Sequence, residues 1–312
     1  MDSKKSISTT DLAKICGVSQ GTVDRALNNR SGISAATKQR ILDAAKKYNY
    51  RPNIHARSIA GGKSMLIGVV VFDLHNQYFS DILTSIECCC AAKGYSTVVM
   101  LTEKSANKEI KCIENLHHMS VDGIVLCPIN RGEEFENFLL SLEIPIVTIG
   151  NCLEKIPYVG IDNTLAMQET VTYVKNKGYE TVVYVSPPLH SSDNTFAQTE
   201  RLDAFCKTAQ KEHLQYVVAD ISDAEQAIVP GKKNALICPT NVYALRLIQV
   251  AEKHHAGIVG FDNMLLIDLL GIKLDSVSYD VDATAKAVVD YIIDNCELPV
   301  AIEHHIVERG SI

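Results

Sequence analysis

From residue 65 to the end of the chain, short apolar runs alternate with stretches in which apolar residues recur at helical spacing. Residues 65–72 read MLIGVVVF, which is typical of a buried strand, and residues 78–94 then follow a helical period. The pattern recurs at the runs YSTVVML, GIVLCP, IPIVTIG, TVVYVS, NALICP and GIVGFD. Strands that alternate with helices of about 10–15 residues indicate parallel sheets in βαβ units. We therefore expect an α/β fold with parallel sheets over residues 65–312.

Polar and aromatic residues follow several of these expected strands. In parallel sheets ligands bind beyond the carboxyl ends of the strands, so the residues found there are the first candidates for a site. Aromatic rings stack on the C–H faces of a sugar or similar polyol, while amides, carboxylates and an arginine hydrogen-bond its hydroxyls. The candidate binding residues for such a small-molecule effector are Asp73, Asn76, Tyr78, Phe79, Arg201, Asn241 and Asp262.

The charge of the chain is unevenly distributed. Residues 1–64 contain twelve Lys and Arg against four acidic residues, whereas the remaining residues carry 18 basic and 33 acidic ones. The chain as a whole has a formal net charge of -7. A basic N-terminal segment on an acidic body predicts that only this segment meets a polyanion such as DNA, because the body repels it.

Residues 8–50 show the spacing of three short helices. A helix capped by Ser8, Thr9 or Thr10 is expected before Gly17, a second one after it, and a third with Ser34 as its cap. The apolar faces consist of Leu12, Ala13, Ile15 and Cys16, then of Val18, Val23, Ala26 and Leu27, and finally of Ile41, Leu42, Ala45 and Tyr48. Two short helices joined by a tight glycine turn predict a helix-turn-helix, and a plain three-helix bundle with solvated charges is the alternative.

The second of these helices exposes small polar residues. Its outward positions are Ser19, Gln20, Gly21, Thr22 and Arg25, which can reach base edges and phosphates in the major groove of DNA. Pro52 ends the third helix, and residues 53–60 can form one or two helical turns that fold only on DNA. Ile59 would then serve as an apolar wedge in the minor groove, whereas the alternative is an ordinary flexible linker.

The N-terminal segment closely resembles the N-terminus of the LacI/GalR family of bacterial transcription regulators. The resemblance lies in the run DLAKICGVSQGTVDRALNN, in YNYRPN and in spaced residues of HARSIAG. The resemblance implies a recognition helix at about 19–28 and a hinge helix at about 53–60. It places Gln20, Gly21 and Arg25 at base-reading positions. The candidate DNA-binding residues are Thr10, Ser19, Gln20, Gly21, Thr22, Arg25, Asn28, Arg57 and Ile59.

The rest of the chain is similar to the two-lobed, periplasmic-binding-protein-like effector domain of the same family, through the runs HNQYFSDI, VDGIVL, VGIDN, ERLDAF and GFDN. That resemblance implies that Tyr78, Phe79, Arg201 and Asp262 contact the effector, with Asn241 next. Three alternatives stay open. Tyr78 and Phe79 can simply begin a helix packed on the sheet, Arg201 can form a lobe-closing ion pair with Asp262, and Asp162 can be a helix cap.

Three departures from the family pattern bear on both sites. Asp24 replaces a common serine and can pair with Arg25 or Arg30, or accept from a cytosine amine. Ile59 stands in place of the usual hinge leucine. Thr240-Asn241 stands where the family often has Asn-Asp, and the region 214–262 is shortened, so the effector itself cannot be transferred from a relative.

Several other classes of protein are disfavoured by the sequence. The start MDSKKSISTT lacks the apolar core of a secretion signal, no apolar run reaches the roughly 20 residues of a membrane span, and ten irregularly spaced cysteines suit reduced thiols in the cytoplasm. The adjacent histidine pairs and the run Cys88–Cys90 point to different sides of a helix, which disfavours a metal site. No catalytic motif is evident.

These observations predict a cytoplasmic, homodimeric transcription regulator, most simply a repressor of a carbohydrate operon, with no enzymatic activity and no cofactor beyond a sugar-like effector. Its expected partners are double-stranded palindromic operator DNA and that effector, without a membrane. We expect a helix-turn-helix domain over residues 1–51, a hinge helix and linker over 52–64, and a two-lobed effector-binding and dimerisation domain over 65–312. The alternatives are an architectural DNA binder and a sugar-modifying enzyme with a fused DNA-binding head.

Overall fold

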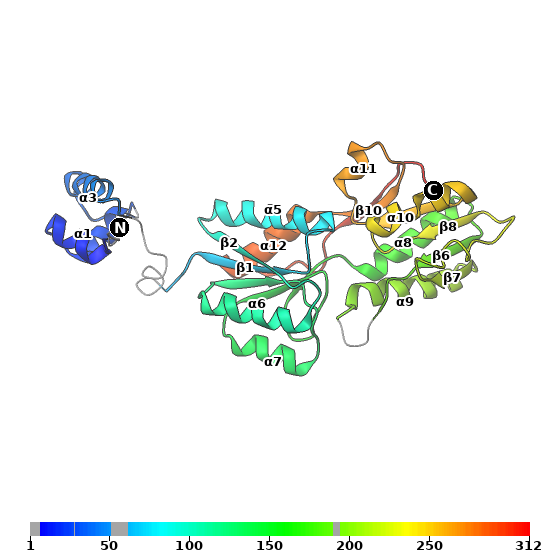
Figure 1. Cartoon of the computed structure of the whole chain (residues 1–312), viewed down its shortest axis with the longest axis horizontal. Helices are drawn as coiled ribbons and strands as arrows, with labels where there is room; N and C mark the ends of the chain where they lie inside the picture. The colour runs from blue at the N-terminus through cyan, green and yellow to red at the C-terminus, as the bar shows by residue number, and fades with distance from the viewer. Residues whose placement is uncertain (1–6, 28, 51–61, 190–193) are drawn as a thin grey trace, which may run out of the picture. The chain divides into compact units, whose positions relative to one another are not determined.

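The computed structural model describes residues 7–27, 29–50, 62–189 and 194–312. The chain divides into two compact units, residues 1–64 and residues 65–312, and each is described by itself (Figure 1). The first unit consists of helices α1 (Thr9–Cys16), α2 (Gln20–Leu27) and α3 (Ala35–Lys47). Ser8 caps α1 in a capping box with Asp11, and Gly17 ends the helix in the left-handed conformation that favours glycine. The expected helix-turn-helix is therefore confirmed.

The core of this unit differs from the expected one at Ile15, Leu42 and Tyr48, of which Leu42 is partly buried but outside the core. Leu12, Val23 and Ile41 are fully buried at its centre, whereas Ile15 and Tyr48 are each 45% exposed. Ile15 lies at the margin of the apolar stripe, about 100° around the helix from Cys16. Tyr48 lies at the end of α3, and the chain then turns through the left-handed residue Asn49. This turn brings Tyr50, in place of Tyr48, against the core, where its hydroxyl lies 3.0 Å from Thr9 Oγ1.

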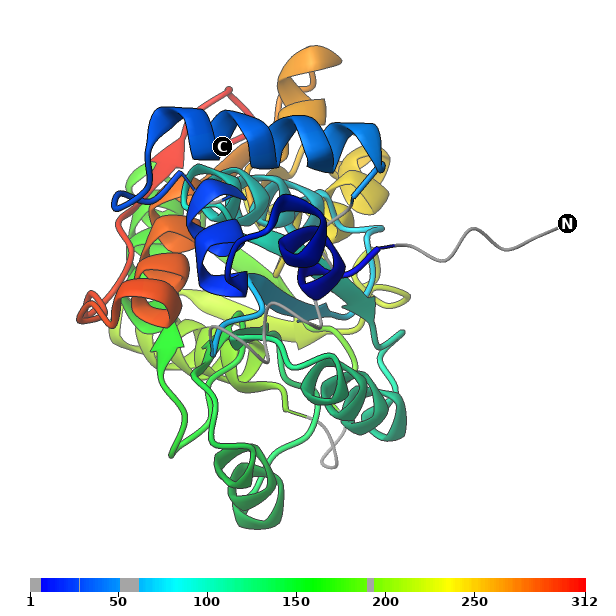
Figure 2. The same cartoon turned by 90° about the vertical axis from the view of Figure 1, so that its left-hand side faces the viewer.

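Residues 65–312 form two lobes, each built on a sheet. The first sheet has the order β2-β1-β3-β4-β5 and is parallel throughout. Its strands are β1 (Leu66–Val71), β2 (Ser96–Leu101), β3 (Gly123–Leu126), β4 (Ile146–Ile149) and β5 (Tyr158–Val159). Helices α5 (Gln77–Ala92) and α12 (Val281–Asp294) cover one face, and α6 (Ala106–His118) and α7 (Glu133–Ser141) cover the other (Figures 1 and 2). Because both faces are covered, the strands are apolar on both sides.

The second sheet has the order β11-β10-β9-β8-β6-β7 and is parallel except for the edge strand β11. Its strands are β6 (Thr181–Val185), β7 (Gln215–Ala219), β8 (Asn234–Ile237), β9 (Gly257–Phe261), β10 (Asp275–Tyr279) and β11 (His304–Val307). Val182 and Tyr184 pack toward α8 (Asn163–Asn176) and α9 (Phe196–Lys211). Val183 and Val185 pack toward α10 (Asn241–His254) and α11 (Leu265–Leu269). The predicted α/β fold with parallel sheets is thus confirmed.

The chain passes from one lobe to the other between β5 and α8, between β10 and α12, and again between α12 and β11. Ile161 and Ile302 pair across two of these connections. The expected strands are all present, whereas β5, β7 and β10 were not expected from their sequences. In the part of the chain that the structure describes, no helix combines the length and the apolar character needed to cross a membrane.

Candidate effector pocket and DNA-reading helix

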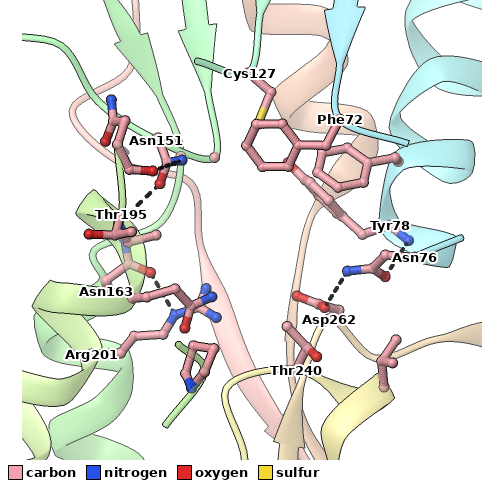
Figure 3. A pocket seen from close by; sticks show the side chains of 18 of the residues that line it. Phe72, Asn76, Tyr78, Cys127, Asn151, Asn163, Thr195, Arg201, Thr240 and Asp262 are labelled. Carbon is pink, nitrogen blue, oxygen red and sulfur yellow. Dashed lines mark hydrogen bonds between the residues drawn. The ribbon is translucent and has the colours of Figure 1, made fainter. Parts of the chain in front are cut away.

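A cavity of about 470 Å³ lies between the two lobes, at the carboxyl ends of their strands (Figure 3). This is the location expected for a ligand in parallel sheets. The first lobe contributes residues that follow β1, β3 and β4, and the second lobe contributes residues that follow β6, β8 and β9. Six of the seven candidate effector residues line it, namely Asp73, Asn76, Tyr78, Phe79, Arg201 and Asp262.

Arg201 is held rigidly in the wall of the cavity. It lies in the second turn of α9 and is 5% exposed. Its Nε donates to Asn163 Oδ1 at 2.9 Å and its Nη1 donates to the Pro239 carbonyl oxygen at 2.7 Å. The guanidinium also stacks 4.3 Å from the centre of the Phe261 ring. The alternative of an ion pair with Asp262 is wrong, because the guanidinium bonds elsewhere and the carboxylate has other partners.

Asp262 follows β9 on the opposite side of the cavity (Figure 3). Its carboxylate accepts a hydrogen bond from the Tyr279 hydroxyl at 2.8 Å and another from Asn76 Nδ2 at 3.2 Å. Asp262 and Asn263 both have positive φ, at 90° and 45°. Two such residues in succession store strain, which typically marks a functional loop. Burial raises the pKa of Asp262, and Arg201 partly offsets that effect.

The raised pKa of Asp262 predicts a pH-dependent contribution to stability. Burial disfavours the ionised carboxylate in the folded chain only. The free energy of unfolding therefore decreases as the pH rises from below 3.8, the ordinary pKa of an aspartate, through the raised pKa of Asp262. We expect Asp262→Asn to be more stable relative to the native chain at neutral pH than at pH 3.5, measured by urea unfolding. A stability difference that does not change with pH would show that the carboxyl titrates at its ordinary pKa.

Aromatic rings line the first-lobe side of the cavity. Tyr78 lies 5.3 Å from Phe79 and 5.6 Å from Tyr279, ring centre to ring centre, in edge-on contacts. Asn76 caps α5 by accepting from the Tyr78 amide at 3.1 Å. Tyr78 and Phe79 therefore do begin a helix packed on the sheet, and they also line the cavity. Burial raises the pKa of Tyr78 well above its usual range, so its hydroxyl stays protonated.

Asn241 is the one candidate effector residue that does not line the cavity. It is fully buried at the first turn of α10, and its Oδ1 accepts from Ser276 Oγ at 2.9 Å. A Cβ on Gly260 would lie 2.2 Å from the same oxygen, so the side chain fills the space above that glycine. The prediction that Asn241 contacts the effector is therefore corrected, because its side chain does not reach the cavity. Its neighbour Thr240 lines the cavity instead.

Several residues that line the cavity were not among the candidates. They include Cys127, Asn151, Tyr158, Asn163, Asn194, Gln198 and Tyr279. Tyr158 lies in the two-residue strand β5 and Tyr279 ends β10, and neither strand has a long apolar run to reveal it. Asp162 caps α8 by accepting from the Leu165 amide at 2.8 Å, as its structural alternative predicted, while its neighbour Asn163 holds Arg201.

The second helix of the N-terminal unit presents the predicted polar face. Ser19, Gln20, Gly21 and Arg25 are exposed and Thr22 is partly exposed, with the Ser19 and Thr22 hydroxyls 2.9 Å apart. Thr10 is exposed on α1. Asp24 pairs with Arg30 at 3.1 Å, which agrees with one of the roles expected for it. Asn28, Arg57, Ile59 and the predicted hinge helix lie outside the described residues, and the DNA contacts remain predictions.

No metal-like cluster of three or more His, Cys, Asp or Glu side chains occurs among the described residues. Cys88 is exposed, Cys89 is partly buried and Cys90 is buried, as their positions around α5 predicted. His254 lies 2.9 Å from Glu225, and His304 lies 3.1 Å from Glu169. In each of these pairs the imidazole contacts a single carboxylate.

Comparison with known proteins covers both units. Residues 8–53 match the family described as bacterial regulatory proteins, lacI family, and residues 64–231 match the periplasmic binding proteins and sugar binding domain of LacI family. The HTH-type transcriptional regulator PtxS of Pseudomonas putida is 30% identical over 207 residues, 65% of this chain and 59% of that protein. The catabolite control protein A of Staphylococcus aureus is 27% identical over 96% of this chain and 98% of its own.

Among solved structures, the lac repressor dimer bound to operator and an anti-inducer has a similar fold. It superposes with a TM-score of 0.80 at 19% identity, over 99% of this chain and all of the other chain. The similarity covers the helix-turn-helix and both lobes.

Proposed function

The chain belongs to the LacI family of bacterial transcriptional regulators, and on that premise we propose that it represses a carbohydrate-related operon in the cytoplasm under the control of a sugar-like effector. The cavity between the lobes supports this most directly. Arg201 and Asp262 lie on opposite sides of it, and aromatic rings and amides also line it. A polyol fits this set, because each hydroxyl both donates to a carboxylate and accepts from a guanidinium.

The effector acts on DNA affinity through the two lobes. Since the lobes are joined by three connections, a ligand between them favours whichever arrangement gives it the better contacts. The resulting coupling between effector and operator needs to be about 1–3 kcal/mol for a useful switch. The regulator requires no catalytic group or cofactor for this task.

We also propose that the chain acts as a homodimer. Three leucines of α11 and its C-cap Leu270 are exposed to an unusual degree: Leu265 by 57%, Leu266 by 42%, Leu269 by 71% and Leu270 by 63%. An apolar patch of this kind on a soluble chain marks an interaction surface. A second copy is the fitting partner, because a two-fold dimer binds a palindromic operator through two helix-turn-helix units.

Selection of bound fragments from the source genome by the full chain tests the proposal. We expect enrichment of one palindromic sequence, and loss of that enrichment in the variant Arg25→Ala, which removes an exposed cation from α2. Lys207→Ala, an exposed cation of α9 in the acidic body, is the matched control and should leave the enrichment intact. Binding without any sequence preference would instead favour the architectural role, and turnover of a sugar would favour the enzyme.

A further inference from the structure

Among the residues that the structure describes, two separate sets of hydrogen bonds join the lobes, at opposite edges of the cavity (Figure 3). One set is formed by Asn151 of the first lobe and Asn194 of the second, and we name it the clasp. The other is formed by Asn76 with Asp262 and by Gln77 with Leu266, and we name it the latch. We infer that the cleft opens asymmetrically, with the clasp as the pivot that stays closed and the latch as the edge that separates.

The clasp is a reciprocal network of buried amides. The Asn194 backbone amide donates to the Ile129 carbonyl oxygen at 2.6 Å, and its Nδ2 donates to the Cys152 carbonyl oxygen at 2.9 Å. Asn151 Nδ2 donates in return to the Asn194 carbonyl oxygen at 2.8 Å, and Asn151 Oδ1 accepts from the Ala197 amide at 3.3 Å.

Burial makes the clasp hard to open. Asn151 is 7% exposed and Asn194 is 8% exposed. Separating the lobes here breaks four hydrogen bonds together, and the low exposure of both asparagines keeps water from replacing these bonds one at a time. The clasp is therefore the edge at which the lobes remain joined.

A buried carboxylate supports the first-lobe side of the clasp. Glu109 of α6 is fully buried, and it accepts from the amides of Ile129 and Asn130 at 2.8 and 2.9 Å. These bonds fix the loop after β3, whose Ile129 carbonyl oxygen receives the Asn194 amide. The acceptor used by the second lobe is thus held in place from behind, which is what a pivot requires.

The latch is weaker than the clasp, because its hydrogen bonds are long and its residues are more exposed to water. Asn76 Nδ2 donates to Asp262 at 3.2 Å, and the Leu266 amide donates to Gln77 Oε1 at 3.3 Å. Asn76 and Gln77 are only partly buried and Leu266 is exposed, so water can replace these bonds when the lobes separate. Opening at this edge is therefore the less unfavourable motion.

The latch ends on the same carboxylate that faces the cavity. This one step rests on the proposed function. When the effector lies in the cavity, a hydroxyl group that donates to the Asp262 carboxylate competes with Asn76 for that carboxylate. The occupant of the cavity then acts directly on the latch through Asp262. This gives the effector a direct means of changing the angle between the lobes.

Hydrogen exchange measures the two edges separately, because the backbone amides of Asn194, Ala197 and Leu266 each donate across the cleft. The experiment compares the effector-free full chain with Asn76→Ala, Asn151→Ala and the control Asn115→Ala, which alters an exposed amide of α6. Asn76→Ala should speed exchange at Leu266 by about three- to tenfold, the effect of losing one hydrogen bond, and leave Asn194 within twofold. Asn151→Ala should speed exchange at both edges, and the control at neither.

Equal acceleration of Asn194 and Leu266 in Asn76→Ala would overturn the asymmetric opening, as would unchanged exchange at Leu266 in Asn151→Ala. Amides of the central strand β8 report unfolding. If the β8 amides also exchange faster in Asn151→Ala, that variant is partly unfolded and Asn194→Ala replaces it under the same criteria. Asn194→Ala keeps the two clasp hydrogen bonds that the backbone of residue 194 makes. The experiment contains neither DNA nor effector, so it tests the opening of the cleft independently of the proposed function. A negative result would not contradict the proposed regulation, and failure of the proposed regulation would not change the exchange pattern.

Discussion

Replacing Leu269 and Leu270 by glutamate is expected to turn the chain into a monomer and to weaken operator binding by about 100-fold or more. These two leucines are 71% and 63% exposed on and beside α11, and two buried charges at a dimer interface cannot be accommodated without partners. A monomer engages one half-site at a time and loses the gain in avidity of roughly 10²–10⁴ that comes from linking two binding units. Light scattering gives the mass of the particle, and titration of labelled operator gives the affinity.

A matched control separates this effect from a general effect of surface charge. Val300 is fully exposed and lies outside α11, so Val300→Glu makes the same kind of apolar-to-acidic change away from the proposed interface. We expect this variant to keep both the mass of a dimer and the affinity of the native chain. If Leu269→Glu with Leu270→Glu stays dimeric, the leucines of α11 are not the interface and another surface must join the two copies.

Arg201→Ala is expected to abolish the response to the effector while leaving operator binding without effector within about twofold. The guanidinium is the buried cation of the cavity wall, and truncating one such charged partner typically weakens binding by about 2–5 kcal/mol. The variant should also unfold at a lower temperature, since Asn163 and Pro239 each lose the donor that satisfies them. The measurement is operator affinity with and without the effector identified from the genes beside the selected operator.

Lys207→Ala on the same helix is the control for this prediction, because Lys207 is exposed and its removal leaves the cavity unchanged. The Arg201→Ala variant has two informative failures. A preserved effector response would remove Arg201 from the binding site. Loss of operator binding in the absence of effector would show that Arg201 holds the lobes in the DNA-binding arrangement and is not a contact to the ligand alone.

Residues at the ends of strands were predictable because the alternation of apolar runs locates those ends along the chain. Tyr78, Arg201 and Asp262 were placed in this way, and all three line the cavity. Asn241 follows a strand equally closely, yet its side chain points back toward Gly260 and away from the cavity. The period of a strand or helix places a residue near an edge of the sheet, but the packing of the neighbouring strand decides which way its side chain points.

The sequence by itself determined the parallel α/β architecture of residues 65–312, the helix-turn-helix before it, and the edge of the sheets at which the cavity lies. These features depend on hydrophobic periodicity, turn residues and charge, all of which are local along the chain. Only the tertiary structure decided which groups meet across the cleft. Arg201 reaches Asn163 and Pro239 in place of Asp262, and Asn151 meets Asn194, 43 residues further along the chain. Such pairs depend on how two sheets and their loops pack together, and no spacing within a single element specifies that packing.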